Sequence, residues 1–202
     1  MKSRNRTWLA IGLFVPLAAI LLATFACLPA PVGDAEQAKV DETLVGAYRA
    51  MPKNAEDKAS ILAVLRPWDA HTYLLEYYMV NKTDDKEERQ ITHFKAWLTT
   101  LGGKTFMCAE PKEDFKFLGD SGDKPFWLVM RLDKTATGMN IRIVDEGSEF
   151  IKGLTKREEL EAAIKAHVDD KIYGSGDATA FKKLGKEDQV FLEMVLGKFN
   201  TK

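Results

Sequence analysis

The sequence is poor in cysteine. Only Cys27 and Cys108 occur among 202 residues, which excludes the framework of several disulfides found in many small secreted proteins. One bridge between these two cysteines stays open, and it would require the start of the chain to lie against the domain. If Cys27 is modified or removed, Cys108 is a lone thiol on a strand, which is typical of a small buried hydrophobic residue.

Signatures of metal binding are also missing. The three histidines, His71, His93 and His167, are far apart in the sequence, and none has a partner at metal-ligand spacing. The acidic stretch "GDSGD" at 119–123 lacks the full oxygen-ligand spacing of a calcium loop and favours a hairpin turn. The mixed charges of "TDDKEER" at 83–89 indicate a solvated loop. We therefore predict no metal site and no cofactor site.

Motifs for catalysis and for nucleic-acid binding are lacking as well. No serine lies in a G-x-S-x-G elbow, so no catalytic residue is assigned. The "LGG" stretch joins two predicted strands and does not start a helix, so it does not form a phosphate-binding loop. The formal net charge is −1, which gives no indication of nucleic-acid binding.

One long apolar run is present, at the amino terminus. Lys2, Arg4 and Arg6 precede an uncharged segment that extends from Trp8 to Ala26. Basic residues stay on the cytoplasmic side while apolar residues partition into the bilayer. The run is longer than the apolar part of a typical cleaved signal, about 7 to 15 residues, and close to the roughly 20 that span a membrane. Residues 1–26 are therefore predicted to be a signal peptide or a membrane anchor, with the rest of the chain outside the cytoplasm.

The end of this run resembles the lipobox of bacterial lipoproteins. The resemblance is carried by Thr24, Phe25, Ala26 and Cys27, with a small residue directly before the cysteine. It implies that Cys27 is acylated and becomes the mature amino terminus, anchored by several acyl chains. The family prefers Leu where Thr24 stands and a small residue where Phe25 stands. Two other possibilities stay open: ordinary cleavage at the small residues Thr24 and Ala26, and an uncleaved span.

Cleavage before Cys27 would leave 176 residues, enough for one domain with a sizeable core. The leader holds three of the 29 basic residues, so 26 would remain against 30 acidic ones. Residues 27–42 contain proline, alanine and charged residues with little apolar periodicity. They are predicted to be a tether between the membrane and a globular domain at 43–202.

The first hundred residues of this domain have the pattern of β-strands. In 71–80, for example, Tyr73, Leu75, Tyr77 and Met79 alternate with residues of the opposite face. About seven strands are predicted within 43–145, enough for an antiparallel meander that forms a sandwich or a partly closed barrel. Their ranges are 43–50, 59–68, 71–80, 90–101, 104–110, 125–133 and 138–145.

The last fifty residues change to helical periodicity, within 155–197. A first helix is expected to begin with Thr155 as its cap and Glu158 reaching back to it. Two short helices are predicted to follow, at 177–185 and 186–198, the second ending at Gly197. Strands followed by helices indicate an α+β fold, mostly antiparallel β, with the C-terminal helices packed on the sheet.

Two further resemblances concern this domain. The opening Leu44–Tyr48, "LVGAY", is similar to the first strand of lipocalins, whose Gly-x-Trp closes the floor of a barrel; here Tyr48 stands in place of the Trp. The stretch "FKAWLTTLGGKTFMCAEP" resembles uncharacterised bacterial envelope proteins in its layout of strands. This second resemblance implies a fold and no known activity.

Two functions are compatible with these features. The favoured one is an exported, membrane-anchored protein of the bacterial cell envelope with a non-catalytic binding or structural role, whose partner is a protein or a small apolar molecule. The alternative is an extracytoplasmic hydrolase, which would need His71 or His93 to meet an acid such as Asp69 or Glu76. Four aromatic residues could line an apolar pocket, although the protein core is favoured: Trp68, Trp97, Phe126 and Trp127.

Overall fold

The computed structural model describes most of the chain after residue 26. The predicted signal peptide or anchor at 1–26 lies outside the described residues, and so do the "GDSGD" loop and the greater part of the charged loop at 83–89. The described residues are 27–52, 60–82, 87–112, 126–169, 172–173, 178–188, 190–193 and 196.

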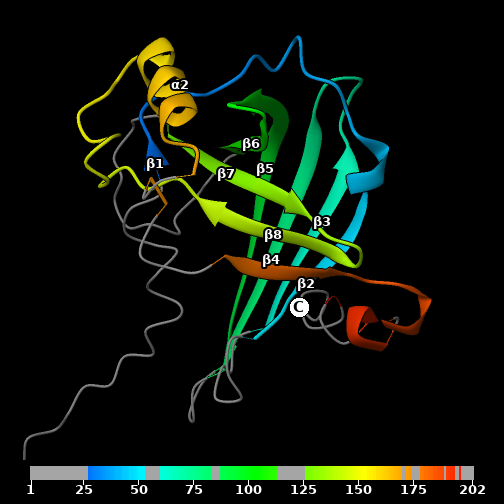
Figure 1. Ribbon diagram of the computed structural model, residues 1–202. Coiled ribbons are helices and arrows are strands. Elements are labelled where there is room, and N and C mark those ends of the chain that lie inside the picture. Colours follow the sequence, from blue (N-terminus) through cyan, green and yellow to red (C-terminus); the bar gives the residue numbers. More distant parts are fainter. Residues whose placement is uncertain are drawn as a thin grey trace, which may run out of the picture.

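Eight antiparallel strands form a closed barrel (Figure 1). Each strand pairs with the next along the chain from β2 to β9, and β9 pairs with β2, which closes the ring. The predicted α+β class and mostly antiparallel meander are confirmed. The strands are β2 Gly46–Ala50, β3 Ser60–Pro67, β4 Tyr73–Lys82, β5 Glu87–Leu101, β6 Lys104–Pro111, β7 Trp127–Lys134, β8 Gly138–Ile143 and β9 Thr179–Lys183.

The strand that completes the barrel is where a helix was predicted. Residues 177–185 were expected to be helical, yet Thr179–Lys183 is β9 and pairs with both β2 and β8. Its burial alternates, with Phe181 buried and Ala180 exposed. A five-residue segment is too short for its periodicity to separate helix from strand. The unpaired backbone groups at the edges of β2 and β8 determine its conformation.

Helix α2, Arg157–Ala166, confirms the first predicted helix. Its predicted cap is wrong, because Lys156 holds the N-cap conformation and makes no side-chain cap hydrogen bond. Acidic residues in its first turn stabilise the helix, because they lie at the positive end of the helix dipole. Leu160 and Ile164 are fully buried and face the outer wall of the barrel.

The C-terminal segment covers another part of that wall. The predicted helix at 186–198 is a 3-10 turn, η2 Lys186–Asp188, followed by helical residues at 190–193. Phe191 packs on the outer face of β2 and β3, and the guanidinium carbon of Arg49 lies 4.1 Å from its ring centroid. The expected end at Gly197 lies outside the described residues.

The predicted tether is instead part of the fold. Strand β1, Cys27–Leu28, pairs with the start of β7, and Leu28 and Val32 are fully buried. The indole nitrogen of Trp97 donates a hydrogen bond to the Val32 carbonyl at 2.8 Å. The linker-like composition of 27–42 was misleading, because a few apolar residues are enough to fill the outer core formed by α2, β5, β6 and β7.

Candidate functional site

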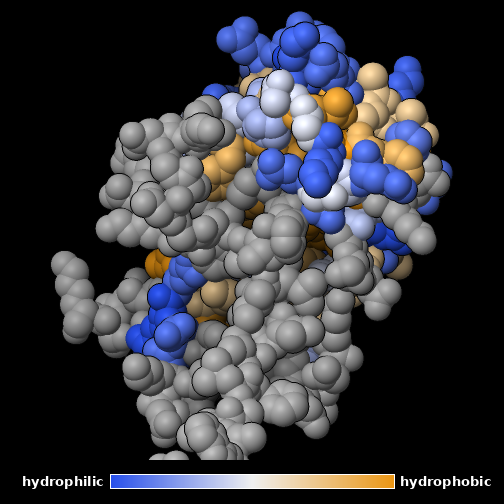
Figure 2. Space-filling view, turned by 90° about the vertical axis from the view of Figure 1, so that its left-hand side faces the viewer, coloured by the Kyte–Doolittle hydropathy of each residue, from blue (hydrophilic) through white to orange (hydrophobic). Residues whose placement is uncertain are grey.

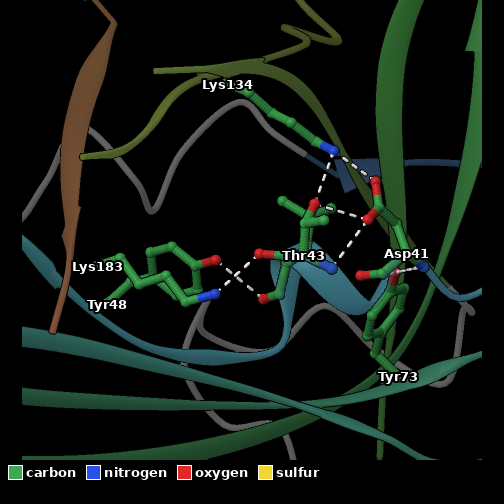
Figure 3. A network of polar contacts seen from close by, with 7 residues as sticks. Asp41, Thr43, Tyr48, Tyr73, Lys134 and Lys183 are labelled. Atoms are coloured by element: carbon green, nitrogen blue, oxygen red, sulfur yellow. Dashed lines mark hydrogen bonds and ion pairs between the residues drawn. The ribbon is translucent and has the colours of Figure 1, made fainter. Parts of the chain in front are cut away.

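One end of the barrel is closed by residues 41–45, which we call the closing segment. It contains the 3-10 turn η1, Glu42–Leu44, and leads directly into β2. Two lysines at strand ends hold it (Figure 3). Lys134 contacts the Asp41 carboxylate and donates to Thr43 Oγ1 at 3.0 Å, and Lys183 donates to the Thr43 carbonyl at 2.8 Å. The ends of β7 and β9 are thereby tied to the start of β2.

Two buried tyrosines complete this closure from inside the barrel. The Tyr48 hydroxyl donates to the Leu44 carbonyl at 3.0 Å, and the Tyr73 hydroxyl accepts from the Asp41 backbone N–H. Gly46 has φ +142°, and a Cβ there would lie 2.8 Å from Lys183 Cε. The absent side chain lets Lys183 reach the closing segment, with its ammonium 5.6 Å from the Tyr48 ring centroid.

The Asp41 carboxylate makes this closure dependent on pH. Hydrogen bonds from Lys134 and then from Thr43 lower its pKa from 3.8 to about 2. A group whose pKa falls on folding stabilises the protein above its ordinary pKa, and that contribution is lost as the pH falls through about 2. Because the pair is partly solvated, we expect Asp41→Asn to lower the free energy of unfolding by about 1 kcal/mol at neutral pH.

Urea denaturation of both proteins checks this expectation. The difference between wild type and Asp41→Asn should be constant from pH 7 to about 5, and should shrink as the pH falls from about 4 toward 2. A difference that does not change across that acidic range would contradict the assigned role of Asp41.

On four strands the interior becomes more accessible with distance from the closing segment, whereas β5 and β6 have half-buried interior-facing residues toward both ends. On β4, the interior-facing Tyr73 and Leu75 are buried, while Tyr77 and Met79 further along are half-buried. The same change occurs on three other strands: from Leu65 to Ile61 on β3, from Leu132 to Leu128 on β7, and from Met139 to Ile141 and Ile143 on β8. All of these strand ends lie at the end of the barrel opposite the closing segment, because neighbouring strands run antiparallel.

The accessible part of the interior is apolar. Isoleucine, leucine, methionine and tyrosine side chains from β3, β4, β7 and β8 face it. Three methionines, Met107, Met130 and Met139, lie in the packed part directly behind it, and methionine adapts its shape to what it contacts. Hydrophilic residues, in contrast, cover much of the described outer surface on the side of α2 (Figure 2). The candidate site is this half-buried, mostly apolar interior.

The aromatic residues singled out in the sequence do not line it. Trp97 and Trp127 belong to the outer core, Phe126 is half-buried, and Trp68 is half exposed with the Lys112 ammonium 4.7 Å from its ring centroid. The prediction that these aromatic residues belong to the protein core and not to a pocket therefore holds for Trp97 and Trp127. Interior aromatics come instead from Tyr48, Tyr73, Tyr77, Phe94 and Phe181.

One of the contacts required for a hydrolase is present, on the outer wall. Glu76 and His93 are cross-strand neighbours on β4 and β5, with 3.8 Å between Oε1 and Nε2. Glu76 also lies 2.9 Å from Arg66 and accepts a hydrogen bond from Tyr78. These contacts surround one buried carboxylate with an arginine, a histidine and a tyrosine hydroxyl.

The second pair of candidate catalytic residues, Asp69 and His71, makes hydrogen bonds with backbone groups. Asp69 accepts a hydrogen bond from the His71 N–H at 2.8 Å, and that bond is the largest cause of its lowered pKa. The His71 ring bonds to the Ala38 carbonyl at 2.8 Å. Asp69 therefore shapes the turn between β3 and β4. In the described part of the chain, no group of three or more His, Cys, Asp or Glu side chains could hold a metal ion.

The order of the strands places Cys27 and Cys108 too far apart to form a disulfide. Cys27 lies opposite Leu128 on one edge of β7, and Cys108 lies on β6 along the other edge. Two strand spacings amount to roughly 9 to 10 Å, beyond the approximately 4.4 to 6.8 Å between Cα atoms of a disulfide. Cys108 is buried, and this burial raises the pKa of its thiol to about 12, which makes it an unreactive core residue.

Comparison with known proteins yields no relative. No protein-family model matches this sequence, no curated protein is significantly similar to it, and no solved structure significantly matches its fold. Within the described residues, no helix is both long and apolar enough to cross a bilayer.

Proposed function

We propose that this protein is a non-catalytic binding protein of the bacterial cell envelope, exported and anchored to the membrane, that holds a small apolar molecule inside its barrel. The observation that carries the proposal is the interior itself, which the closing segment covers at one end and which is mostly apolar and half-buried toward the other.

The dimensions and chemistry of the barrel support this function. Eight strands give an interior that side chains can just fill, or that holds one small ligand. Ligand sites are typically apolar with few polar groups, and apolar surface that a ligand removes from water contributes about 25 cal/mol per Å². Leu44–Tyr48, which resembles the opening strand of lipocalins, lies at the end of the barrel that the closing segment covers.

The anchor is proposed to be Cys27, as the lipobox resemblance implies. The backbone of Cys27 pairs with β7, so this residue is part of the described fold. An acylated Cys27 would hold the barrel wall close to the membrane surface without an intervening tether. Intact-mass analysis of protein extracted from membranes separates an acylated Cys27 from a free amino terminus and from an uncleaved leader.

A glutamate inside the barrel tests the binding function. We expect the wild-type protein to bind an uncharged apolar dye such as N-phenylnaphthylamine, and Ile143→Glu on β8 to weaken that binding by at least about tenfold, because an unpaired charge is costly in apolar surroundings. Dye fluorescence during titration measures both affinities.

A matched control is Ile91→Glu, because Ile91 lies on the outer face of β5 and is 41% exposed. This variant should bind the dye as the wild type does. The proposal is wrong if the wild type binds no apolar dye, or if the two glutamate variants weaken binding equally.

A further inference from the structure

One polar group faces the apolar interior without a partner. Among the described residues, four buried side-chain oxygens make no hydrogen bond, and they belong to Thr72, Glu76, Tyr77 and Ser148; the Glu76 oxygen has an ion-pair partner, since it lies 2.9 Å from Arg66. Thr72 and Glu76 alternate with the interior-facing positions of β4, and Ser148 lies between β8 and α2. The Tyr77 hydroxyl is therefore the member of this group that points into the barrel.

Tyr77 lies where the packed interior meets the accessible interior. It follows the buried Leu75 on the same face of β4 and precedes the half-buried Met79. The residue as a whole is half-buried, whereas its hydroxyl oxygen is buried. Its cross-strand neighbours are the smaller Ala63 on β3 and Thr92 on β5.

The other two interior tyrosines indicate what Tyr77 lacks. The hydroxyls of Tyr48 and Tyr73 both bond to the closing segment, as buried hydroxyls normally do. A buried hydroxyl without a partner is unfavourable, so a molecule that supplies one gains affinity from it. Burial also raises the pKa of Tyr77, which keeps its proton available for donation at neutral pH.

The charges of the interior restrict the ligand further. Lys134 and Lys183 end the interior-facing rows of β7 and β9, and both are engaged by the closing segment. The half-buried residues that surround the accessible interior are uncharged: Ala50, Ile61, Met79, Gln90, Leu128, Ile141, Ile143 and Thr179. A ligand carboxylate placed beside Tyr77 would therefore have no described cation to neutralise it.

We infer that the Tyr77 hydroxyl donates a hydrogen bond to an uncharged oxygen of the bound molecule. The ligand class is then a neutral lipid-like molecule, with an ester, ketone or alcohol group on a hydrocarbon chain, in preference to a fatty acid or a bare hydrocarbon. This inference rests on the proposed function, because it concerns the same interior.

Three ligands of similar chain length test it: methyl laurate, laurate and dodecane, each displacing the apolar dye at neutral pH. The wild-type protein should bind methyl laurate about fivefold to tenfold more tightly than dodecane, the effect of one net hydrogen bond. It should bind laurate more weakly than the ester.

The variant Tyr77→Phe should lose the preference for the ester over dodecane and keep the affinity for dodecane. The matched control is Tyr78→Phe, next along β4 on the opposite face, where the hydroxyl bonds to Glu76; it should keep the wild-type preference. The melting temperature of Tyr77→Phe without ligand should be equal to or above that of the wild type, because the change removes an unsatisfied hydroxyl.

The outcomes distinguish this inference from the proposed function. If Tyr77→Phe keeps the wild-type preference for the ester, or if laurate binds more tightly than the ester, the inference is wrong while binding in the barrel stands. If the wild type binds neither the dye nor any of the three ligands, the proposed function itself is wrong.

Discussion

Replacement of Gly138 by alanine should destabilise the barrel more than any other substitution considered in this protein. A Cβ at this first residue of β8 would lie 1.9 Å from the backbone oxygen of Phe181 on β9. No heavy atoms pack that closely, and a backbone oxygen in a paired strand cannot turn aside as a flexible side chain can. The two strands must separate, and their pairing completes the ring. We expect a loss of at least about 3 kcal/mol in the free energy of unfolding, at the upper end of overpacking.

Urea denaturation followed by tryptophan fluorescence measures this loss. The control is Thr137→Ala in the same turn, an exposed position where the change should stay within about 0.5 kcal/mol. Because the variant disturbs the barrel wall, it should also weaken binding of the apolar dye. A Gly138→Ala protein as stable as the wild type would mean that β8 and β9 do not pack as described, and the barrel would then not be closed at this point.

Leu28→Ala should cost about 3 kcal/mol, as expected when a fully buried leucine is truncated and leaves a cavity. Leu28 belongs to the outer core with Phe106, Val129 and Leu160. A residue in a flexible tether would contribute nothing measurable to folding. The variant therefore decides whether the segment 27–42 is part of the folded unit.

The same denaturation measurement applies, with Lys39→Ala as the control, because Lys39 lies in the same segment and is exposed. That control should leave the stability within about 0.5 kcal/mol of the wild type. Equal stabilities for Leu28→Ala and Lys39→Ala would mean that residues 27–42 form a tether and are not part of the folded domain. A large difference between them would place residues 27–42 within the folded unit.

Part of the candidate site can be predicted from the sequence. The alternation of residues 71–80 correctly places Tyr73, Leu75 and Tyr77 on one face of a strand, because a half-buried strand repeats every two residues. The sequence does not show which of these residues the barrel leaves accessible. That depends on where the closing segment crosses the barrel, and its contacts join Asp41 and Thr43 to lysines about 90 and 140 residues away.

The errors have related causes. Residues 177–185 were predicted as a helix because local composition cannot show that the edges of β2 and β8 need a partner. Residues 27–42 were predicted as a tether because burial of Leu28 and Val32 depends on α2, far along the chain. In both segments, contacts between distant parts of the chain overrode local propensity.

The sequence by itself determines the apolar run at 8–26, the strand-rich middle and the helix at 157–166, because each depends on local hydrophobicity and periodicity. Only the tertiary structure decides that the sheet closes into a ring, that one end is sealed by two lysines and two tyrosines, and that the Tyr77 hydroxyl lacks a partner. Closure and burial are properties of residues that meet across long stretches of chain, and no local pattern encodes which of them meet.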